Sequence, residues 1–210
     1  MIPYCSATGT RTTREQFLNN GWRVLWVATG HNWASNPHLP YAIDNGAWSA
    51  HLRGKPFSEE AFIECLEFSR VRPELGTPDF TVLPDIVAGG LPSLDYSLSW
   101  ESRVRPYSEN VLIAVQDGMN PKDIEPYIDE HTGIFVGGST PWKLRTLPIW
   151  GAVARGRCYL HVGRVNSVKR ISFCSGVGAH SFDGTSAAKF PSTFKLLNRA
   201  RKQMALPLGS

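Results

Sequence analysis

The sequence lacks the features that would place it in a membrane or outside the cell. It holds no apolar run long enough to span a bilayer, and Met1 leads into Ile2–Cys5 without the basic and apolar regions of a signal peptide. The four cysteines form no CxxC pair, which favours reduced thiols over a disulfide framework. We therefore expect a protein without membrane contact that works in the cytoplasm, or in the host cytoplasm if its source is viral.

Signals for common cofactors are missing too. No GxGxxG motif follows an early strand, and no glycine-rich loop ends in Lys-Ser or Lys-Thr, so neither a dinucleotide site nor a phosphate loop is predicted. Two pairs, Cys158 with His161 and Cys174 with His180, have spacings that zinc sites use. Cys158 and His161, however, fall in one short predicted strand, where side chains alternate between faces. The sequence thus predicts no cofactor and no metal.

The composition fits one globular domain. The 210 residues are 42% hydrophobic and 19% charged, which is enough for a sizeable core but cramped for two domains. The net charge is +4, and basic residues crowd into and just before a C-terminal helix expected over about 190–204: Lys189, Lys195, Arg199, Arg201 and Lys202. Such a cluster suits the phosphate backbone of a nucleic acid, although charge alone is equally compatible with a basic protein that binds none.

Apolar runs alternate with amphipathic or turn-rich stretches along the whole chain, a pattern typical of parallel sheets. Eight runs are predicted to be strands: 2–6, 23–28, 40–44, 80–86, 111–116, 133–137, 158–163 and 178–183. Helices are expected over 61–70, 142–147 and 168–174, with another opening at Pro121 and a loop over 29–39. Ser58, Thr140 and Ser167 stand where helix N-caps belong.

Eight strands with intervening helices predict a compact α/β fold, a TIM-like (β/α)8 barrel that spans residues 1–210 as a single domain. Typical barrels of this type need about 250 residues, so short connections and a missing helix are expected. An open doubly wound sheet is the competing fold. The missing GxGxxG motif weakens the dinucleotide-binding version of that alternative.

Three aspartates stand at the ends of predicted strands: Asp44, Asp85 and Asp183. In a parallel barrel the C-terminal ends of the strands converge on one face, and barrel enzymes place their sites there. A single Asp after a strand is usually a helix cap or a turn former. Three of them, each after apolar residues, favour carboxyls whose acid–base behaviour is tuned by burial and by one another.

Other residues near the strand ends have a structural interpretation beside the functional one. Gln116 could offer its amide to a base edge or tie down a neighbouring loop. The pair Gly137-Gly138 could present a backbone N–H to a planar ligand or form a tight turn. Trp48 could stack on a substrate ring or pack in the core. Asn45 and His161 are further candidates for contact with a base.

In their order along the chain these motifs resemble those of the tRNA-guanine transglycosylase superfamily, and more closely its viral and bacterial branch that inserts 7-deazaguanines into DNA. The segment 43–48 (IDNGAW) is similar to the family's DSGGF motif, and 181–186 (SFDGTS) is similar to its DxFDC motif. The segments around Pro84-Asp85, Gln116 and Gly137-Gly138 resemble those with which the family recognises guanine. The likeness consists of scattered short motifs.

The resemblance implies a barrel enzyme that exchanges bases through a covalent intermediate. Asp183 would be the nucleophile, and Asp44 would be the general acid and base. Asp85 would read the Watson–Crick edge of guanine, while the amide of Gln116 and the backbone of Gly137-Gly138 would contact the base carbonyl. The basic C-terminal segment would then hold phosphates of the nucleic acid.

Two departures from the family pattern bear on the substrate. The tRNA-acting members carry a CxCxxC…His zinc subdomain after the nucleophile, whereas no residue after Asp183 is Cys or His. Gly184 stands in place of the Cys that follows the nucleophile, and Ala47 in place of a glycine in the first motif. The expected partners are therefore DNA rather than tRNA and, as co-substrate, a free 7-deazaguanine such as 7-cyano-7-deazaguanine.

The sequence thus predicts a pentosyltransferase that replaces guanine in DNA with a 7-deazaguanine through an aspartyl–sugar intermediate. Three alternatives stay open. They are an N-glycosidase in which water replaces the second base, a tRNA-guanine transglycosylase, and a barrel that binds nucleic acid without chemistry. The N-glycosidase would use the same residues, so the sequence does not exclude it.

Overall fold

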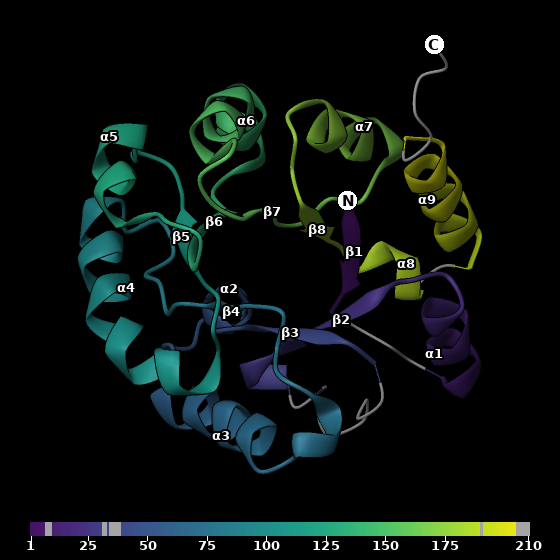
Figure 1. The fold of residues 1–210 in the computed structure, drawn as a ribbon, viewed down its shortest axis with the longest axis horizontal. Helices are drawn as coiled ribbons and strands as arrows, with labels where there is room; N and C mark the ends of the chain where they lie inside the picture. Colours follow the sequence, from purple (N-terminus) through teal and green to yellow (C-terminus); the bar gives the residue numbers. More distant parts are fainter. Residues whose placement is uncertain (7–9, 31–32, 34–38, 190, 205–210) are drawn as a thin grey trace.

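The structure is a computed structural model that describes residues 1–6, 10–30, 33, 39–189 and 191–204. Eight parallel strands pair in sequence order, and β8 pairs with β1, which closes the barrel (Figure 1). The strands are β1 Ile2–Cys5, β2 Arg23–Val27, β3 Tyr41–Asp44, β4 Thr81–Val82, β5 Val111–Val115, β6 Thr132–Val136, β7 Leu160–Val162 and β8 Ser181–Asp183. The predicted single-domain (β/α)8 barrel is confirmed.

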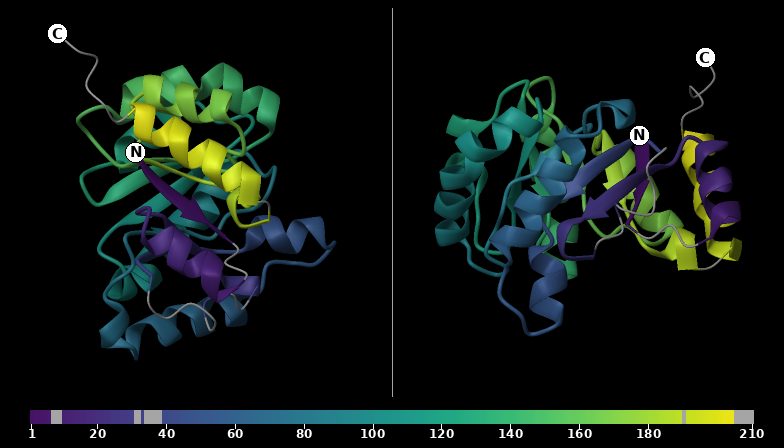
Figure 2. Two further views of the ribbon diagram at one scale, coloured as in Figure 1. Left: turned by 90° about the vertical axis from the view of Figure 1, so that its right-hand side faces the viewer. Right: turned by 90° about the horizontal axis from the view of Figure 1, so that it is seen from below.

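Helices surround these strands (Figure 1). They are α1 Arg11–Leu18, α2 Ala47–Leu52, α3 Glu59–Arg70, α4 Leu91–Val104, α5 Pro121–Ile124, α6 Thr140–Ala154, α7 Val168–Gly176, α8 Ser186–Lys189 and α9 Pro191–Met204. Short 3-10 helices cover Ala28–Gly30, Pro73–Leu75, Arg105–Tyr107 and Glu125–Tyr127. In Figure 2, α2 projects from the body of the molecule, and α9 packs against the outside of the barrel beside α1. Within the described ranges, every helix is too short or too polar to serve as a transmembrane span.

Most strands are shorter than predicted, and β6 keeps its predicted length but begins one residue earlier, at Thr132. β4 covers two residues rather than 80–86, because Pro84 lacks the N–H that a central ladder needs. β7 and β8 begin later than expected, at Leu160 and Ser181. Of the expected loop over 29–39, residues 29–30 belong to a 3-10 helix, and 31–32 and 34–38 lie outside the described residues. The ladders are short, so side-chain packing must supply much of the barrel's stability.

Serine side chains begin several helices. Ser58 and Ser167 cap α3 and α7, as predicted. The prediction that Thr140 caps α6 is wrong, because Ser139 Oγ accepts the hydrogen bond from Trp142 N, and Thr140 is the first helical residue. α6 also extends well beyond its predicted end. These caps fix where the chain enters each helix at the face where the strands end.

Two buried layers hold the barrel together. Alternate strand residues fill the lumen with a small apolar cluster: Tyr4, Leu25, Ala42, Phe80, Val82, Leu112 and Ala114. The residues between them face outward into a larger core shared with the helices. Above the lumen cluster lies His161, fully buried, with its ring centroid 5.0 Å from those of both Phe80 and Phe135. The lumen is therefore packed with rings up to the level where the carboxyls begin.

A polar cluster covers the N-terminal face of the barrel. Asp79, just before β4, accepts a hydrogen bond from Tyr4 Oη at 2.8 Å and forms an ion pair with Arg23. Burial raises the pKa of Tyr4, which keeps its hydroxyl protonated as the donor. This end of the barrel is thus closed by fixed hydrogen bonds, and the opposite end carries the candidate site.

Gly133 in β6 occupies a position without room for a side chain. A Cβ there would lie 2.4 Å from Tyr159 O and 2.6 Å from Leu112 Cδ2. We expect Gly133→Ala to lower the free energy of unfolding by about 1–3 kcal/mol, the usual cost of overpacking a core, as measured by urea denaturation. Gly176→Ala, in a helix with nothing within 4 Å, is the matched control and should not destabilise the protein. Equal losses in the two variants would contradict this account.

Candidate active site

Three aspartates meet at the C-terminal ends of the strands, as the sequence predicts. Asp44 ends β3, Asp85 follows β4, and Asp183 ends β8. Burial raises the pKa of Asp44 to about 7, with the negative charges of Asp183 and Asp85 acting in the same direction. The Gly46 N–H, 2.7 Å from Asp44 Oδ1, opposes this rise. Such mutual influence requires carboxyls that lie close together, and Asp44 can hold or release a proton near neutral pH.

Asn45 holds Asp85 in place. Its Nδ2 donates to Asp85 Oδ1 at 3.0 Å and to Leu83 O at 2.7 Å, and its Oδ1 accepts from Ala47 N at 2.7 Å. Burial raises the pKa of Asp85 to about 6, and the Asn45 amide limits that rise. Asn45 is only 2% exposed. The residue predicted as a base contact therefore uses both ends of its amide to position Asp85 and the start of α2.

Asp183 is fixed by hydrogen bonds to one of its oxygens. The carboxyl, in a residue only 7% exposed, has Oδ1 at 3.1 Å from both His161 Nε2 and Arg164 N. On its other side the His161 ring has Nδ1 2.7 Å from Ser181 Oγ. Burial lowers the pKa of His161 and favours the neutral ring. The arrangement fits a proton on Nε2 directed at Asp183, with Nδ1 accepting from Ser181. His161, predicted as a base contact, thus lies beneath Asp183 and orients it.

Gln116 ties down the loop that carries Asp85. Its Nε2 donates to Ile86 O at 2.9 Å and to Ser93 Oγ at 2.7 Å, and the same Ser93 Oγ accepts from Ile86 N at 2.9 Å. The sequence allowed Gln116 either to contact a base or to tie down a neighbouring loop. The observed hydrogen bonds match the second role. The loop after the two-residue β4 is therefore held by side chains of neighbouring elements rather than by a ladder.

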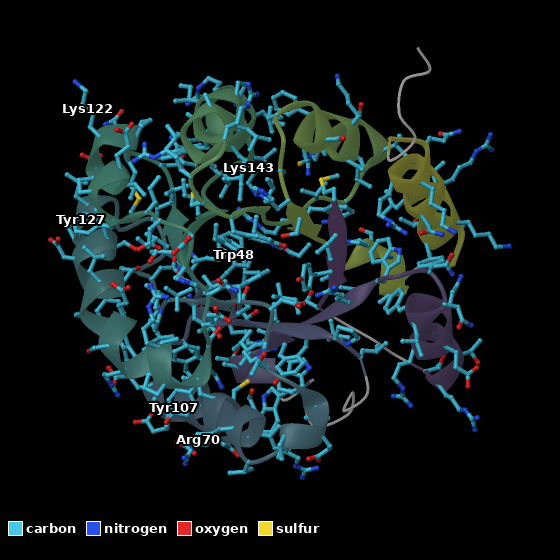
Figure 3. The ribbon with its side chains drawn as sticks, viewed as in Figure 1. Trp48, Arg70, Tyr107, Lys122, Tyr127 and Lys143 are labelled. Carbon is cyan, nitrogen blue, oxygen red and sulfur yellow. The ribbon has the colours of Figure 1, made fainter. Side chains whose placement is uncertain are left out.

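Arg164 reaches over the mouth of the barrel. It follows β7 in the left-handed region at a φ of 60°, and its Cζ lies 4.1 Å from the centroid of the Trp48 ring. Its Nη2 donates to Gly138 O. Trp48 is 38% exposed and lies within the ring of strands (Figure 3), and its ring is also stacked against that of His51, with centroids 5.8 Å apart. Gly137 N donates to Val115 O, whereas Gly138 N–H has no acceptor among the described residues.

The basic C-terminal helix α9 does not end at this site. Arg201 Nη2 donates to Asn20 O at 2.7 Å, and Lys202 Nζ lies 3.2 Å from Asn20 Oδ1. Asn20 belongs to the loop between α1 and β2, which lies at the N-terminal face, opposite the aspartates. The reason is topological, since the helices of a parallel barrel run back toward the face where the strands begin.

The remaining predicted phosphate contacts lie on the outer wall. Lys195 and Arg199 are exposed and line a groove between α1 and α9. Lys189 ends α8, and its side chain lies outside the described part of the structure. The structure therefore does not gather the predicted basic cluster around the carboxyls.

Three other cations, which are absent from the predicted site residues, lie at the ends of the elements that form the mouth. Lys143 and Arg170 lie in the first turns of α6 and α7, and Arg164 follows β7. Lys143 is 7% exposed, and its Nζ donates to Gly163 O beside Asp183; Figure 3 shows its side chain between α6 and the strands. The sequence did carry a signal, because each barrel helix starts at the face where its strand ends. Cations in first helical turns therefore belong to the same face as the strand-end aspartates.

These features define the class of protein: a (β/α)8 barrel with three aspartates at its C-terminal mouth. A scan against models of protein families gave no match, and a search of curated proteins gave none either. Among the described residues, no group of three or more His, Cys, Asp or Glu side chains is placed to hold a metal ion. The resemblance noted above therefore rests on the motif residues themselves.

The electrostatic coupling predicts how Asp44 titrates. Its carboxyl carbon should show a midpoint near pH 7 by NMR, protonated below and ionised above. Asp85→Asn and Asp183→Asn each remove a negative charge that raises this pKa, so both should move the midpoint to lower pH. Asp95→Asn, exposed on α4, is the control and should leave it in place. A midpoint insensitive to both site variants would show that the carboxyls do not converge.

The same shift has a consequence for stability. The folded state binds the Asp44 proton more tightly than the unfolded chain, so this stabilising contribution is complete below the ordinary carboxyl pKa. It is lost as pH rises toward 7. The decline of unfolding free energy over that pH range should be smaller in Asp44→Asn than in the wild type, as measured by urea denaturation at a series of pH values.

Proposed function

We propose that the protein is a base-exchange transglycosylase that replaces guanine in DNA with a 7-deazaguanine. The observation that carries the proposal is the difference between the environments of two carboxyls, Asp183 and Asp44. Asp183 is held by His161 and the Arg164 N–H, while Asp44, at the same end of the barrel, has a pKa raised to about 7. A fixed carboxylate next to a carboxyl that exchanges its proton near neutrality suits a nucleophile and its acid–base partner.

In the first half-reaction, Asp183 attacks the anomeric carbon of the target nucleotide. The bond from that carbon to N9 of guanine breaks, its electron pair goes to the base, and an ester bond to Asp183 forms. The protonated Asp44 gives its proton to the departing base. General acid catalysis of this kind typically contributes about 10²–10⁴ in rate.

The second half-reaction reverses these roles with a new base. Asp44, now a carboxylate, takes the N9 proton of the incoming 7-deazaguanine, whose nitrogen attacks the anomeric carbon. The ester bond breaks, its electron pair returns to Asp183, and Asp44 is again protonated. A group with a pKa of about 7 serves both halves, because its two protonation states are similarly populated near neutral pH.

Recognition of the base falls to groups around the same mouth. Asp85 presents a carboxyl fixed by Asn45, suited to the N–H groups on the Watson–Crick edge of guanine. Trp48 is partly exposed and would stack on the base where Arg164 now covers its ring, and Gly138 has a backbone N–H for the base carbonyl. Because the reacting bond must enter the mouth, the target nucleotide has to be extruded from a duplex or supplied on a single strand.

The exchange itself is the decisive test. The wild type should incorporate 7-cyano-7-deazaguanine into a guanine-containing oligodeoxynucleotide, as measured by mass analysis of the nucleosides. Asp183→Asn should abolish both incorporation and the covalent adduct, and Asp44→Asn should slow turnover by about 10²–10⁴ while DNA binding persists. Asp95→Asn, on the exposed side of α4, is the matched control and should retain full activity.

Other outcomes would contradict the proposal in distinguishable ways. Release of free guanine without incorporation would identify an N-glycosidase. Incorporation into tRNA but not into DNA would identify a tRNA-acting enzyme. DNA binding with steep salt dependence and no chemistry, unchanged in Asp183→Asn, would identify a binding barrel.

The bonds beneath Asp183 predict a positioning role for His161. His161→Phe keeps a ring among Phe80 and Phe135 but removes the hydrogen bonds to Asp183 and Ser181. We expect kcat to fall about 10- to 100-fold, the value of a hydrogen bond to a charged group, with little change in KM. His161→Gln, which retains a donor, should recover part of kcat. If KM rose instead, or if the Gln variant were as slow as the Phe variant, the positioning role would be wrong.

A further inference from the structure

Helix α2 carries the most exposed large hydrophobic side chain among the described residues. Leu52, its last residue, is 66% exposed. The helix follows Asp44 and lies within the connection from β3 to α3, so it belongs to the face where the strands end. In the left view of Figure 2, α2 projects from the body in the direction in which the β1 arrow points. Leu52 is therefore presented to solvent beyond the mouth of the barrel.

This projecting helix is fixed at both ends. Hydrogen bonds from the backbone to the side chains of Asp44 and Asn45 hold its start. After Leu52, the N–H groups of Gly54 and Lys55 each donate to a carbonyl of α2 at 3.0 Å, and Gly54 has a φ of 64°. These two bonds form a Schellman motif, a defined way of ending a helix. We call residues 51–55 the α2 tip, and its backbone has one fixed shape.

The charges of the α2 tip are positive. Arg53 and Lys55 are exposed, and residues 45–58 include no Asp or Glu. Neither cation forms an ion pair with another described residue. An apolar side chain flanked by two such cations is complementary to a partner that has flat apolar faces and an anionic backbone. Stacked bases on a phosphodiester chain have both properties.

The site itself creates a need for such a contact. Asp183, the nucleophile proposed above, is only 7% exposed at the end of β8. A nucleotide of a duplex must leave the base stack to reach it, and the loss of stacking and pairing opposes that movement. Proteins that distort DNA insert apolar side chains, Leu among them, between base steps. A side chain that fills the gap left by the extruded base therefore favours the extruded state.

We infer that the α2 tip binds duplex DNA at the target nucleotide, with Leu52 inserted in the base stack in place of the extruded guanine. Arg53 and Lys55 bind the phosphates on either side of it. The inference rests on the proposed function for the identity of the nucleic acid, and it adds a surface outside the mouth that acts before any bond is broken. Because the tip is already fixed in shape, little conformational freedom is lost on insertion, which favours binding.

Leu52→Ala tests the insertion, and the exposed position makes the variant compatible with the fold. It should weaken binding of a guanine-containing duplex about tenfold or more, because the apolar area that Leu52 buries is lost. Binding of the same sequence as a single strand should change little, since that strand has no paired stack to fill. Leu18→Ala, 56% exposed at the end of α1, is the matched control and should change neither. Binding is measured by fluorescence anisotropy without any 7-deazaguanine.

The state of the target base gives a second readout. With the target guanine labelled with ¹⁵N, its imino NMR signal reports the intact base pair. Saturating wild-type protein should remove this signal, whereas Leu52→Ala at saturation should retain much of it. Leu52→Met, which keeps a long apolar side chain, should restore most of the affinity and of the signal loss.

The phosphate contacts are tested by salt dependence. Arg53→Gln and Lys55→Gln should each reduce the slope of log K against log salt on the duplex by about 0.9, the value for one phosphate contact. Arg155→Gln, exposed at the opposite end of the barrel after α6, is the matched control and should leave the slope unchanged.

Several outcomes would overturn the inference. They are equal losses for Leu52→Ala on the duplex and on the single strand, equal behaviour of Leu52→Ala and Leu18→Ala, an imino signal that persists with the wild type, and no binding of the duplex. If every variant of the α2 tip bound DNA like the wild type, the tip would belong to another partner, such as an acidic protein, and the inference would be wrong.

The two proposals can fail separately. If Leu52→Ala impairs duplex binding and extrusion but the wild type exchanges no base, the α2 surface stands and the proposed chemistry is wrong. If the wild type exchanges bases and Leu52→Ala exchanges them in a duplex equally fast, the chemistry stands and the insertion of Leu52 is wrong. Mass analysis of nucleosides from the duplex and from the single strand, each with 7-cyano-7-deazaguanine, separates these cases.

Discussion

The interaction on which the site depends is the buried contact between His161 and Asp183. It joins the ring-filled lumen below to the carboxyls above, since one imidazole stacks on Phe135, packs at a tilt against Phe80, and bonds Ser181 and Asp183 through its nitrogens. A neutral ring in that position gives hydrogen-bond partners to two buried polar side chains, and Asp183 has a second donor in the Arg164 N–H. The orientation of Asp183 is thus set by the packing of the barrel itself.

The pKa shifts at the mouth follow from the burial of charged groups close to one another. Burial raises the pKa of Asp44 and lowers that of Lys143, and neighbouring like charges act in the same direction on each group. Asp44 and Asp183 belong to the strand ends, whereas Lys143 and Arg170 belong to the first turns of α6 and α7.

Much of this arrangement was predictable from the sequence. The number of strands, their order and the aspartates at three strand ends followed from apolar runs and turn residues, because these patterns reflect local geometry. The roles of Asn45, Gln116 and His161 did not follow, since hydrogen bonds between residues distant in sequence decide them. The prediction that the basic residues of α9 lie at the site failed for a related reason. Composition gives the charge of a helix but not the end of the barrel at which its charged residues lie. Position 184, where the family that the motifs resemble has Cys, has no room for a side chain, as a Cβ on Gly184 would lie 2.6 Å from both Asn166 Oδ1 and Val165 O.

The brevity of β4 has an evolutionary consequence. With two residues in the ladder, the segment that carries Asp85 takes its shape from Asn45, Ser93 and Gln116, which reach it from three other elements. Insertions or exchanges within that segment leave the register of the neighbouring strands untouched. Ligand preference can therefore drift while the barrel is conserved, and a library confined to this loop is the natural starting point for altering which ring the mouth accepts.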